Sequence, residues 1–258
     1  MLNIPCNRLN YGRKRKTEDI TSLVFHYTGN RTDTAKANAE YFKKVRGASA
    51  HFFTDRVNIV QSVSPEYIAY SVGGKKYSDC KKTGGGSYYK VVTNANSISI
   101  EMCSNAGKIA EETQENAIRL AQSLMRQYPS ITTLVRHFDV NGKHCPAWDG
   151  WMGSNASLWY TFRYRVLNEW TNNIDAVFDA DYYLSNNSDL TEAGITKEFA
   201  LAHFLINGIN EGRKAKDTFD VKVYRASNPD LERAFGSKLA KYYEHYCTYG
   251  KKENRKAV

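Results

Sequence analysis

The sequence predicts an α/β domain, with a central β-sheet flanked by helices, followed by a small all-α domain built from a tandem repeat. Three observations predict this fold class. Short β-rich segments alternate with helical segments over the first 170 residues, which is typical of a sheet covered by helices. A segment of about 40 residues then occurs twice, which indicates a separate repeat module. The chain of 258 residues has room for both parts.

The elements of the first domain, expected over residues 1–170, follow from apolar periodicity. We expect strands at residues 23–28, 51–54, 57–63, 97–103 and 134–138, and helices at residues 33–46, 111–128 and 157–170. The helix at 111–128 has an amphipathic pattern that Pro129 ends. Residues 71–96 are rich in Gly, Lys and Tyr and predict a long loop, which in a compact domain is often functional.

The second domain is expected over residues 175–258, with repeats at about 178–216 and 219–258. Identical residues recur in the same order in both copies: Phe178, Asp179, Tyr183, Asn187, Asp189, His203, Gly208, Glu211 and Arg213 match Phe219, Asp220, Tyr224, Asn228, Asp230, His245, Gly250, Glu253 and Arg255. Asp179 and Asp220 are expected to cap helices, and Gly208 to end one. The two copies are expected to pack together, with Tyr183 and Tyr224 either as shared core or as paired binding residues.

Composition excludes several classes of protein. Hydrophobic residues make up 41% and charged residues 24%, which argues against a disordered chain. No apolar run is long enough to cross a bilayer, and the basic N-terminus lacks the apolar core of a secretory signal. Residues 1–170 hold 23 Lys and Arg against 14 Asp and Glu, a net charge of +9. That charge favours a polyanion partner, either nucleic acid or an anionic wall polymer, but no nucleic-acid motif accompanies it.

Two histidines and a cysteine stand where metal ligands are often found. His26 and His137 each lie at the end of an expected strand, and Cys145 follows eight residues after His137. Two imidazoles and one thiolate would leave the fourth position of tetrahedral zinc open for catalysis. Spacing alone is a weak signal, because a single strand histidine is usually structural and a buried cysteine is usually an apolar filler.

Four segments together resemble the zinc-dependent N-acetylmuramoyl-L-alanine amidases of the amidase-2 group, which includes phage endolysins and is related to peptidoglycan-recognition proteins. These segments are V-F-H-Y-T-G at 24–29, A-S-A-H-F-F-T-D at 48–55, S-I-S-I-E-M-C at 97–103, and R-H-F-D followed by K-H-C-P within 136–146. The resemblance implies a mixed sheet, one Zn²⁺ held by His26, His137 and Cys145, and cleavage of the amide between N-acetylmuramic acid and L-alanine.

The resemblance also implies roles for two charged residues. Glu101 matches a family glutamate and would act as general base; the alternative is that it orients a histidine ligand. Lys143, two residues before Cys145, would stabilise the oxyanion, unless it is only a surface lysine. The chain departs from some relatives at Ala50, where they place a catalytic tyrosine, and at 70–73, where many carry a histidine.

Substrate contacts are predicted at Thr28 and Asn30, which follow the first ligand, and at Tyr70. His51 is expected to be mainly structural, with a second interpretation in which it lines the site. The loop residues Tyr77, Tyr88, Tyr89, Lys75 and Lys76 could line a saccharide–peptide groove, or the tyrosines could simply pack the loop.

Taken together, the sequence predicts a phage lysin of a Gram-positive host: a zinc amidase followed by a wall-binding module. It would be made in the host cytoplasm without a signal peptide and released to the cell wall, with peptidoglycan as its partner and no nucleic acid or membrane insertion. The alternatives are a non-catalytic peptidoglycan-binding protein, a host autolysin or sporulation amidase, and a repeat module that serves homo-oligomerisation.

Overall fold

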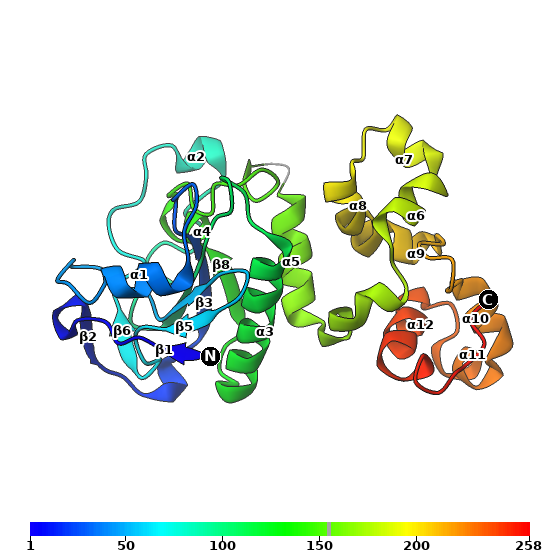
Figure 1. Cartoon of the computed structure of the whole chain (residues 1–258), viewed down its shortest axis with the longest axis horizontal. Helices are drawn as coiled ribbons and strands as arrows, with labels where there is room; N and C mark the ends of the chain where they lie inside the picture. Colours follow the sequence, from blue (N-terminus) through cyan, green and yellow to red (C-terminus); the bar gives the residue numbers. More distant parts are fainter. Residues whose placement is uncertain (154–155) are drawn as a thin grey trace. The chain divides into compact units, whose positions relative to one another are not determined.

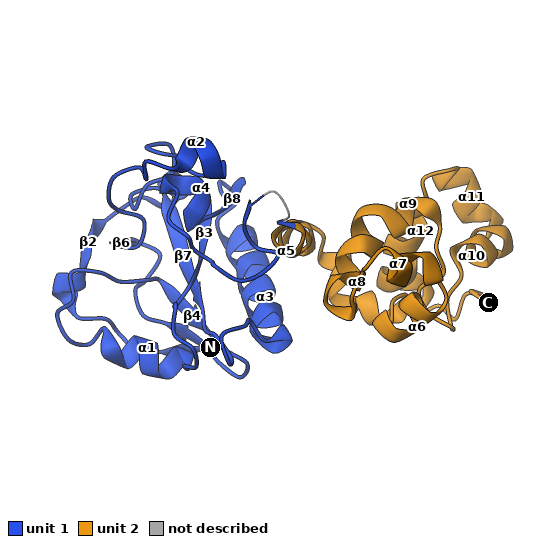
Figure 2. Cartoon of the chain, turned by 90° about the horizontal axis from the view of Figure 1, so that it is seen from above, with its two compact units in different colours: residues 1–156 blue, residues 157–258 orange. Residues whose placement is uncertain are grey.

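The computed structural model describes residues 1–153 and 156–258. The chain forms two compact units, Met1–Ala156 and Ser157–Val258 (Figure 2). The boundary therefore lies earlier than the one expected near residue 170. Helix α5, Ser157–Leu167, belongs to the second unit rather than to the first, because it packs against helix α8 of that unit.

The first unit is built on a six-stranded mixed sheet in the order β1-β5-β4-β7-β3-β8. Its strands are β1 (Leu2–Asn3), β3 (Ser22–Tyr27), β4 (Phe52–Thr54), β5 (Ile59–Gln61), β7 (Ser97–Met102) and β8 (Thr133–Arg136). Strand β4 runs antiparallel to β5, whereas β3, β4, β7 and β8 run parallel to one another. The expected central mixed sheet flanked by helices is confirmed.

Helices pack against this sheet, and a smaller sheet lies beside it (Figure 1). The helices that pack on it are α1 (Ala35–Tyr41), α3 (Glu111–Gln127) and α4 (His137–Asn141), whereas the short helix α2 (Cys80–Thr83) contacts Asn141 of α4. The small sheet pairs β2 (Tyr11–Lys14) with β6 (Tyr67–Ala69). Helix α1 starts at Ala35 rather than at Asp33, because the Thr34 side chain accepts the hydrogen bond from Ala37 and caps it. Among the described residues, no helix combines the length and apolar character that crossing a membrane requires.

The expected strand at 134–138 ends earlier in the structure. Strand β8 stops at Arg136, and His137 is the first residue of α4. The reason is a local cap: the Asp139 carboxylate accepts hydrogen bonds from the Arg136 backbone N–H (2.8 Å) and from its guanidinium (3.0 Å). His137 thus begins a helix instead of ending a strand.

The second unit is built from short helices. They are α5, a 3₁₀ segment at Glu169–Ala176, α6 (Ala180–Ser185), α7 (Ser188–Glu192), α8 (Lys197–His203) and α9 (Ile209–Glu211), then α10 (Val221–Ser227), α11 (Pro229–Phe235) and α12 (Leu239–His245). A π-helical turn follows α8 at Phe204–Gly208 and α12 at Tyr246–Gly250.

The two copies of the repeat make the same internal hydrogen bonds. The Tyr183 hydroxyl lies 2.9 Å from His203 Nδ1, and the Tyr224 hydroxyl lies 2.8 Å from His245 Nδ1. Asp179 caps α6, and Asp220 caps α10, as expected. Both tyrosine side chains are fully buried, which favours their interpretation as shared core over paired binding residues.

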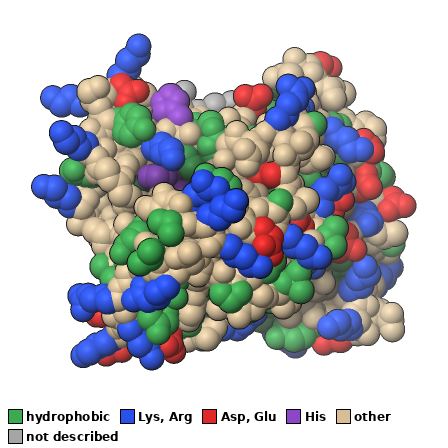
Figure 3. Space-filling view, turned by 60° about the vertical axis from the view of Figure 1, so that its left-hand side comes forward, with side chains coloured by type: hydrophobic (Ala, Val, Ile, Leu, Met, Phe, Trp, Pro, Cys, Tyr) green, Lys and Arg blue, Asp and Glu red, His purple; other side chains and the backbone are tan. Residues whose placement is uncertain are grey.

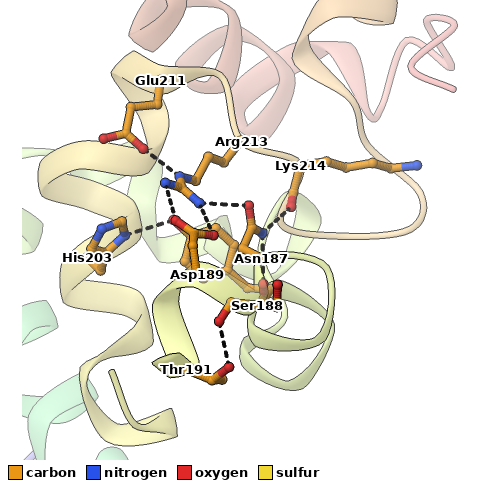
Figure 4. A network of polar contacts seen from close by, with 9 residues as sticks. Asn187, Ser188, Asp189, Thr191, His203, Glu211, Arg213 and Lys214 are labelled. Atoms are coloured by element: carbon orange, nitrogen blue, oxygen red, sulfur yellow. Dashed lines mark hydrogen bonds and ion pairs between the residues drawn. The ribbon is translucent and has the colours of Figure 1, made fainter. Parts of the chain in front are cut away.

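A partly exposed ion pair of the same kind recurs in each copy. Arg213 bonds Asp189 at 2.8 Å and also contacts Glu211 and Asn187 (Figure 4), and Arg255 bonds Asp230 at 2.7 Å. Gly208 does not end a helix as expected; it lies in the π-helical turn, where a Cβ atom would collide with the Tyr183 hydroxyl. The left-handed stop is Gly212, with a φ of 66°.

Candidate metal centre and groove

His26 lies near the end of the central strand β3, in register with Glu101 on the neighbouring strand β7. Residues directly opposite each other on paired strands share a face of the sheet. Five of the six residues of β3 are buried because β7 and β8 flank it on both sides. This central position holds the His26 imidazole, 2% exposed, on a rigid element.

His137 and Cys145 converge on His26. Because β8 is the other neighbour of β3, a residue that follows β8 comes out beside the end of β3. His137 Nδ1 lies 3.1 Å from His26 Nδ1, and Cys145 Sγ lies 3.8 Å from the same atom. The three ligand atoms all lie within 4.8 Å of one another, and all three side chains are buried.

The donor set fits a zinc ion. With Zn–N near ~2.0 Å and Zn–S near ~2.3 Å, tetrahedral geometry places the ligand atoms roughly 3.3–3.6 Å apart. The separations from His26 Nδ1 to the other two ligand atoms, 3.1 and 3.8 Å, bracket that range. Burial lowers the pKa of His26 and lowers that of His137 to about 3, so both imidazoles are neutral, which is the form that binds metal. Burial also raises the pKa of the Cys145 thiol, and a bound cation would reverse that shift.

Glu101 stands beside this cluster. Its Oε1 lies 3.9 Å from His26 Nδ1, and its side chain is 21% exposed. The second carboxylate oxygen, Oε2, is buried and has no hydrogen-bond partner among the described residues. Burial raises the pKa of Glu101 to about 8, against the opposing field of Lys143, and a bound cation would lower that pKa and favour the carboxylate form that accepts a proton. A carboxylate with an unused oxygen beside a metal cluster is placed to exchange a proton there.

A groove of about 550 Å³ opens next to the cluster, a volume within the range of small-ligand sites. His137 and Lys143 line it. Tyr70 and the loop residues 75–77 line it as well, whereas Tyr88 and Tyr89 do not. In Figure 3, which turns the left-hand side of Figure 1 forward, Lys and Arg side chains are spread over the exposed face.

Comparison with known proteins identifies the family. The family model described as N-acetylmuramoyl-L-alanine amidase matches residues 16–148, which is more than half of the chain. The chain belongs to this amidase family.

Curated relatives agree with this assignment. The chain is 33% identical over 159 residues to N-acetylmuramoyl-L-alanine amidase CwlL of Bacillus licheniformis and 30% identical over 160 residues to N-acetylmuramoyl-L-alanine amidase BlyA of Bacillus subtilis. Each match covers 58% of this chain and 42% of the relative, so the chain aligns with about two fifths of those proteins. A mutant structure of PlyL, 22% identical, shares the fold with a TM-score of 0.50 over 65% of this chain and 98% of that one.

The first unit brings together most, but not all, of the residues that the sequence singled out. Tyr70 lines the groove, and the Thr28 hydroxyl is buried without a hydrogen-bond partner among the described residues. The exposed Asn30 amide donates a hydrogen bond to Asp33 at 3.0 Å.

His51 does not line the groove, so its interpretation as a substrate contact is wrong. Its side chain is 1% exposed. One ring nitrogen lies 3.0 Å from the Ser99 hydroxyl, and the other lies 3.1 Å from an Arg15 guanidinium nitrogen and 3.0 Å from the Tyr67 carbonyl. Burial, with the Arg15 charge beside it, lowers the pKa of His51 to about 3. These contacts explain its place in the core as a neutral imidazole that joins three segments.

Two asparagines that shape the groove were not predicted. The Asn94 side chain accepts hydrogen bonds from the backbone of Ser71 (3.0 Å) and Val72 (2.7 Å), and the Asn141 side chain donates to the Gly73 carbonyl (2.9 Å). Both asparagines line the groove. Their only sequence signal is an ordinary turn-forming neighbourhood, which gives no indication of a partner far away in the chain.

Proposed function

We propose that this protein is a peptidoglycan hydrolase that cleaves the amide between N-acetylmuramic acid and L-alanine of the stem peptide, with one Zn²⁺ held by His26, His137 and Cys145. The observation that carries the proposal is the convergence of these three buried side chains beside a groove, in a unit that belongs to the amidase family. When bound, zinc supplies Lewis acidity, which polarises an amide carbonyl and makes water a nucleophile at neutral pH.

Glu101 and Lys143 would complete the chemistry. Glu101 would accept a proton from the attacking water and pass it to the leaving L-alanine amine, so that the amide C–N bond breaks with no proton left over. The Lys143 ammonium would stabilise the negative charge that develops on the carbonyl oxygen. The positive charge of Lys143 lowers the pKa of each of four groups around the cluster, which supports its position next to the reacting atoms. These groups are His26, His137, Glu101 and Cys145. Thr28 and Tyr70 would contact the substrate.

The test is digestion of purified Gram-positive walls followed by mass analysis of the products. We expect new L-alanine amino termini and free lactyl carboxylates on muramic acid, and no new reducing sugar ends. New reducing ends would indicate a glycosidase instead. Binding to walls without any release would favour the alternative of a non-catalytic peptidoglycan-binding protein. The Glu101→Gln variant, run in parallel, controls for a contaminating hydrolase.

We further propose that the second unit attaches the enzyme to the wall. A groove of about 300 Å³ on its second repeat is lined by Phe235, His245 and Tyr249, together with Lys238 and Lys241. The Tyr249 side chain is 58% exposed, and the His245 and Tyr249 ring centroids lie 5.7 Å apart. Exposed aromatic faces beside polar groups suit the apolar faces and the hydroxyls of sugars.

The biological setting proposed is a phage lysin that a host cell makes and that then reaches its wall from within. Relatives from two Bacillus species support a Gram-positive target. A host autolysin or sporulation amidase is the alternative. The two settings differ in the genes that surround the coding sequence, because a lysin is expected beside a gene for a membrane-permeabilising protein.

A further inference from the structure

A loop that carries two lysines is fixed against the helix that begins with a proposed metal ligand. The Tyr77 backbone N–H donates to the Asn141 carbonyl (2.8 Å), and the Gly86 N–H donates to the Phe138 carbonyl (3.0 Å). Gly142, with a φ of 91°, allows this close approach, because a Cβ atom there would collide with Cys80 of the loop. The loop is therefore held in a set position relative to His137, the first residue of α4.

The lysines of this loop that reach the groove are Lys75 and Lys76, and Lys143 belongs to the same lining. Within residues 1–153 and 156–258, no carboxylate forms an ion pair with any of the three. The nearest acid of the loop, Asp79, lies 3.8 Å from His144 instead. The groove thus offers cationic groups whose counter-charge must come from solvent or from a ligand.

We propose that Lys75 and Lys76 bind a free carboxylate of the stem peptide, so that the enzyme favours stems whose second residue keeps its α-carboxylate over stems in which that group is amidated. This inference rests on the proposed amidase function. The amide to be cleaved must lie at the cluster that includes His137, and His137 lines the groove. A carboxylate on the second stem residue then lies roughly 7 Å further along an extended peptide.

The chemistry selects the peptide rather than the glycan as the partner of these lysines. N-acetylated sugars of the glycan strand are neutral, so two ammonium groups would bind them no more tightly than uncharged polar side chains would. The stem peptide carries the carboxylates, and an ammonium–carboxylate hydrogen bond is stronger than one between neutral groups. Because both lysines are exposed, solvent screening reduces the gain to about five- to tenfold in affinity.

The test compares two soluble muramoyl peptides that differ only in a free or an amidated α-carboxyl at the second residue. We expect the full-length enzyme to cleave the free-carboxylate peptide with a kcat/KM roughly five- to tenfold higher. The difference should lie in KM, because this contact is present equally in the ground state and the transition state. In the double variant Lys75→Met/Lys76→Met the ratio of kcat/KM for the two peptides should fall to about one.

The chain offers a matched control in the same loop. Lys81 and Lys82, on α2, are exposed but do not line the groove, so Lys81→Met/Lys82→Met should keep the preference. The charge-conserving Lys75→Arg/Lys76→Arg should keep it as well. Equal cleavage of both peptides by the unmodified enzyme would overturn the inference, and so would a preference that survives Lys75→Met/Lys76→Met. Failure to cleave either peptide would refute the amidase proposal itself, which separates the two failures.

Discussion

Replacing Cys145 by Ser tests the metal centre through stability as well as activity. The substitution exchanges a soft thiolate for a hydroxyl, which is a poor zinc ligand. Loss of an outer partner of a metal ligand typically weakens metal binding about 10–100-fold, so loss of one of three direct ligands should weaken it by at least about 100-fold. Because the Cys145 side chain is 2% exposed, water cannot easily replace it.

The expected size of the effect follows from binding linkage. At free zinc about 100 times the dissociation constant, binding stabilises the folded protein by about 2.7 kcal/mol. A site that binds about 100-fold more weakly gains only about 0.4 kcal/mol at the same zinc concentration, so the variant loses about 2.3 kcal/mol of zinc-dependent stabilisation. For a unit the size of Met1–Ala156, each kcal/mol shifts Tm by ~2–4 °C. The zinc-induced rise in Tm should therefore shrink by ~5–9 °C.

The assay is thermal unfolding with saturating chelator and with added zinc, together with the zinc content per chain. Cys6→Ser is the matched control: Cys6 is also buried in the first unit, but its thiol donates to the Phe42 carbonyl at 3.4 Å, outside the cluster. That variant should keep the full zinc-induced shift. A wild-type Tm that zinc does not move, or an equal shift in Cys145→Ser, would refute the proposed centre.

Three further predictions address other residues. Glu101→Gln should lower turnover by ~10²–10⁴-fold with zinc content unchanged, and Lys143→Ala should lower it by ~10²–10³-fold; near-normal turnover in Glu101→Gln would leave Glu101 only a role in orienting a histidine. Tyr249→Ala should weaken sedimentation of the full chain with sacculi, whereas Asn207→Ala, the matching position of the first repeat, should not; equal binding by both variants would exclude the second-repeat groove. The neutral buried His51, whose folded-state pKa is about 3, contributes stability above the unfolded pKa of about 6.5 that is lost as pH falls towards 3. The free energy of unfolding, measured by chemical denaturation, should fall between about pH 7 and pH 5 by about 2 kcal/mol more in wild type than in His51→Gln. An identical pH dependence in the two proteins would show that His51 takes up no extra proton on unfolding.

The parts of the fold that could be predicted are those with a long, regular pattern. Strand β3 holds an apolar run at Leu23–Phe25, β7 alternates Ile98, Ile100 and Met102 with other residues, and α3 has a full amphipathic period, so each was expected within a residue or two. Strand β1 has two residues, and β2 and β6 pair in a separate small sheet, so no periodic signal marks any of them. His137 was expected within the strand at residues 134–138, but the Asp139 cap that turns the chain into α4 depends on a single side chain.

The metal site shows where sequence reasoning needs the topology. His26 and His137 were each expected near a strand end. They come together only because β3 lies between β7 and β8, and a local sequence pattern does not determine the order of strands in a sheet. The family resemblance implied the ligand set of His26, His137 and Cys145 but not that order. For the groove, neither pattern nor resemblance was enough, because Lys75, Lys76, Lys81 and Lys82 are alike in charge and all lie in one loop. Only the hydrogen bonds from Tyr77 and Gly86 to α4 decide which pair faces the groove. A change that breaks those bonds without touching a lysine should therefore abolish the carboxylate preference while leaving the charge of the loop intact.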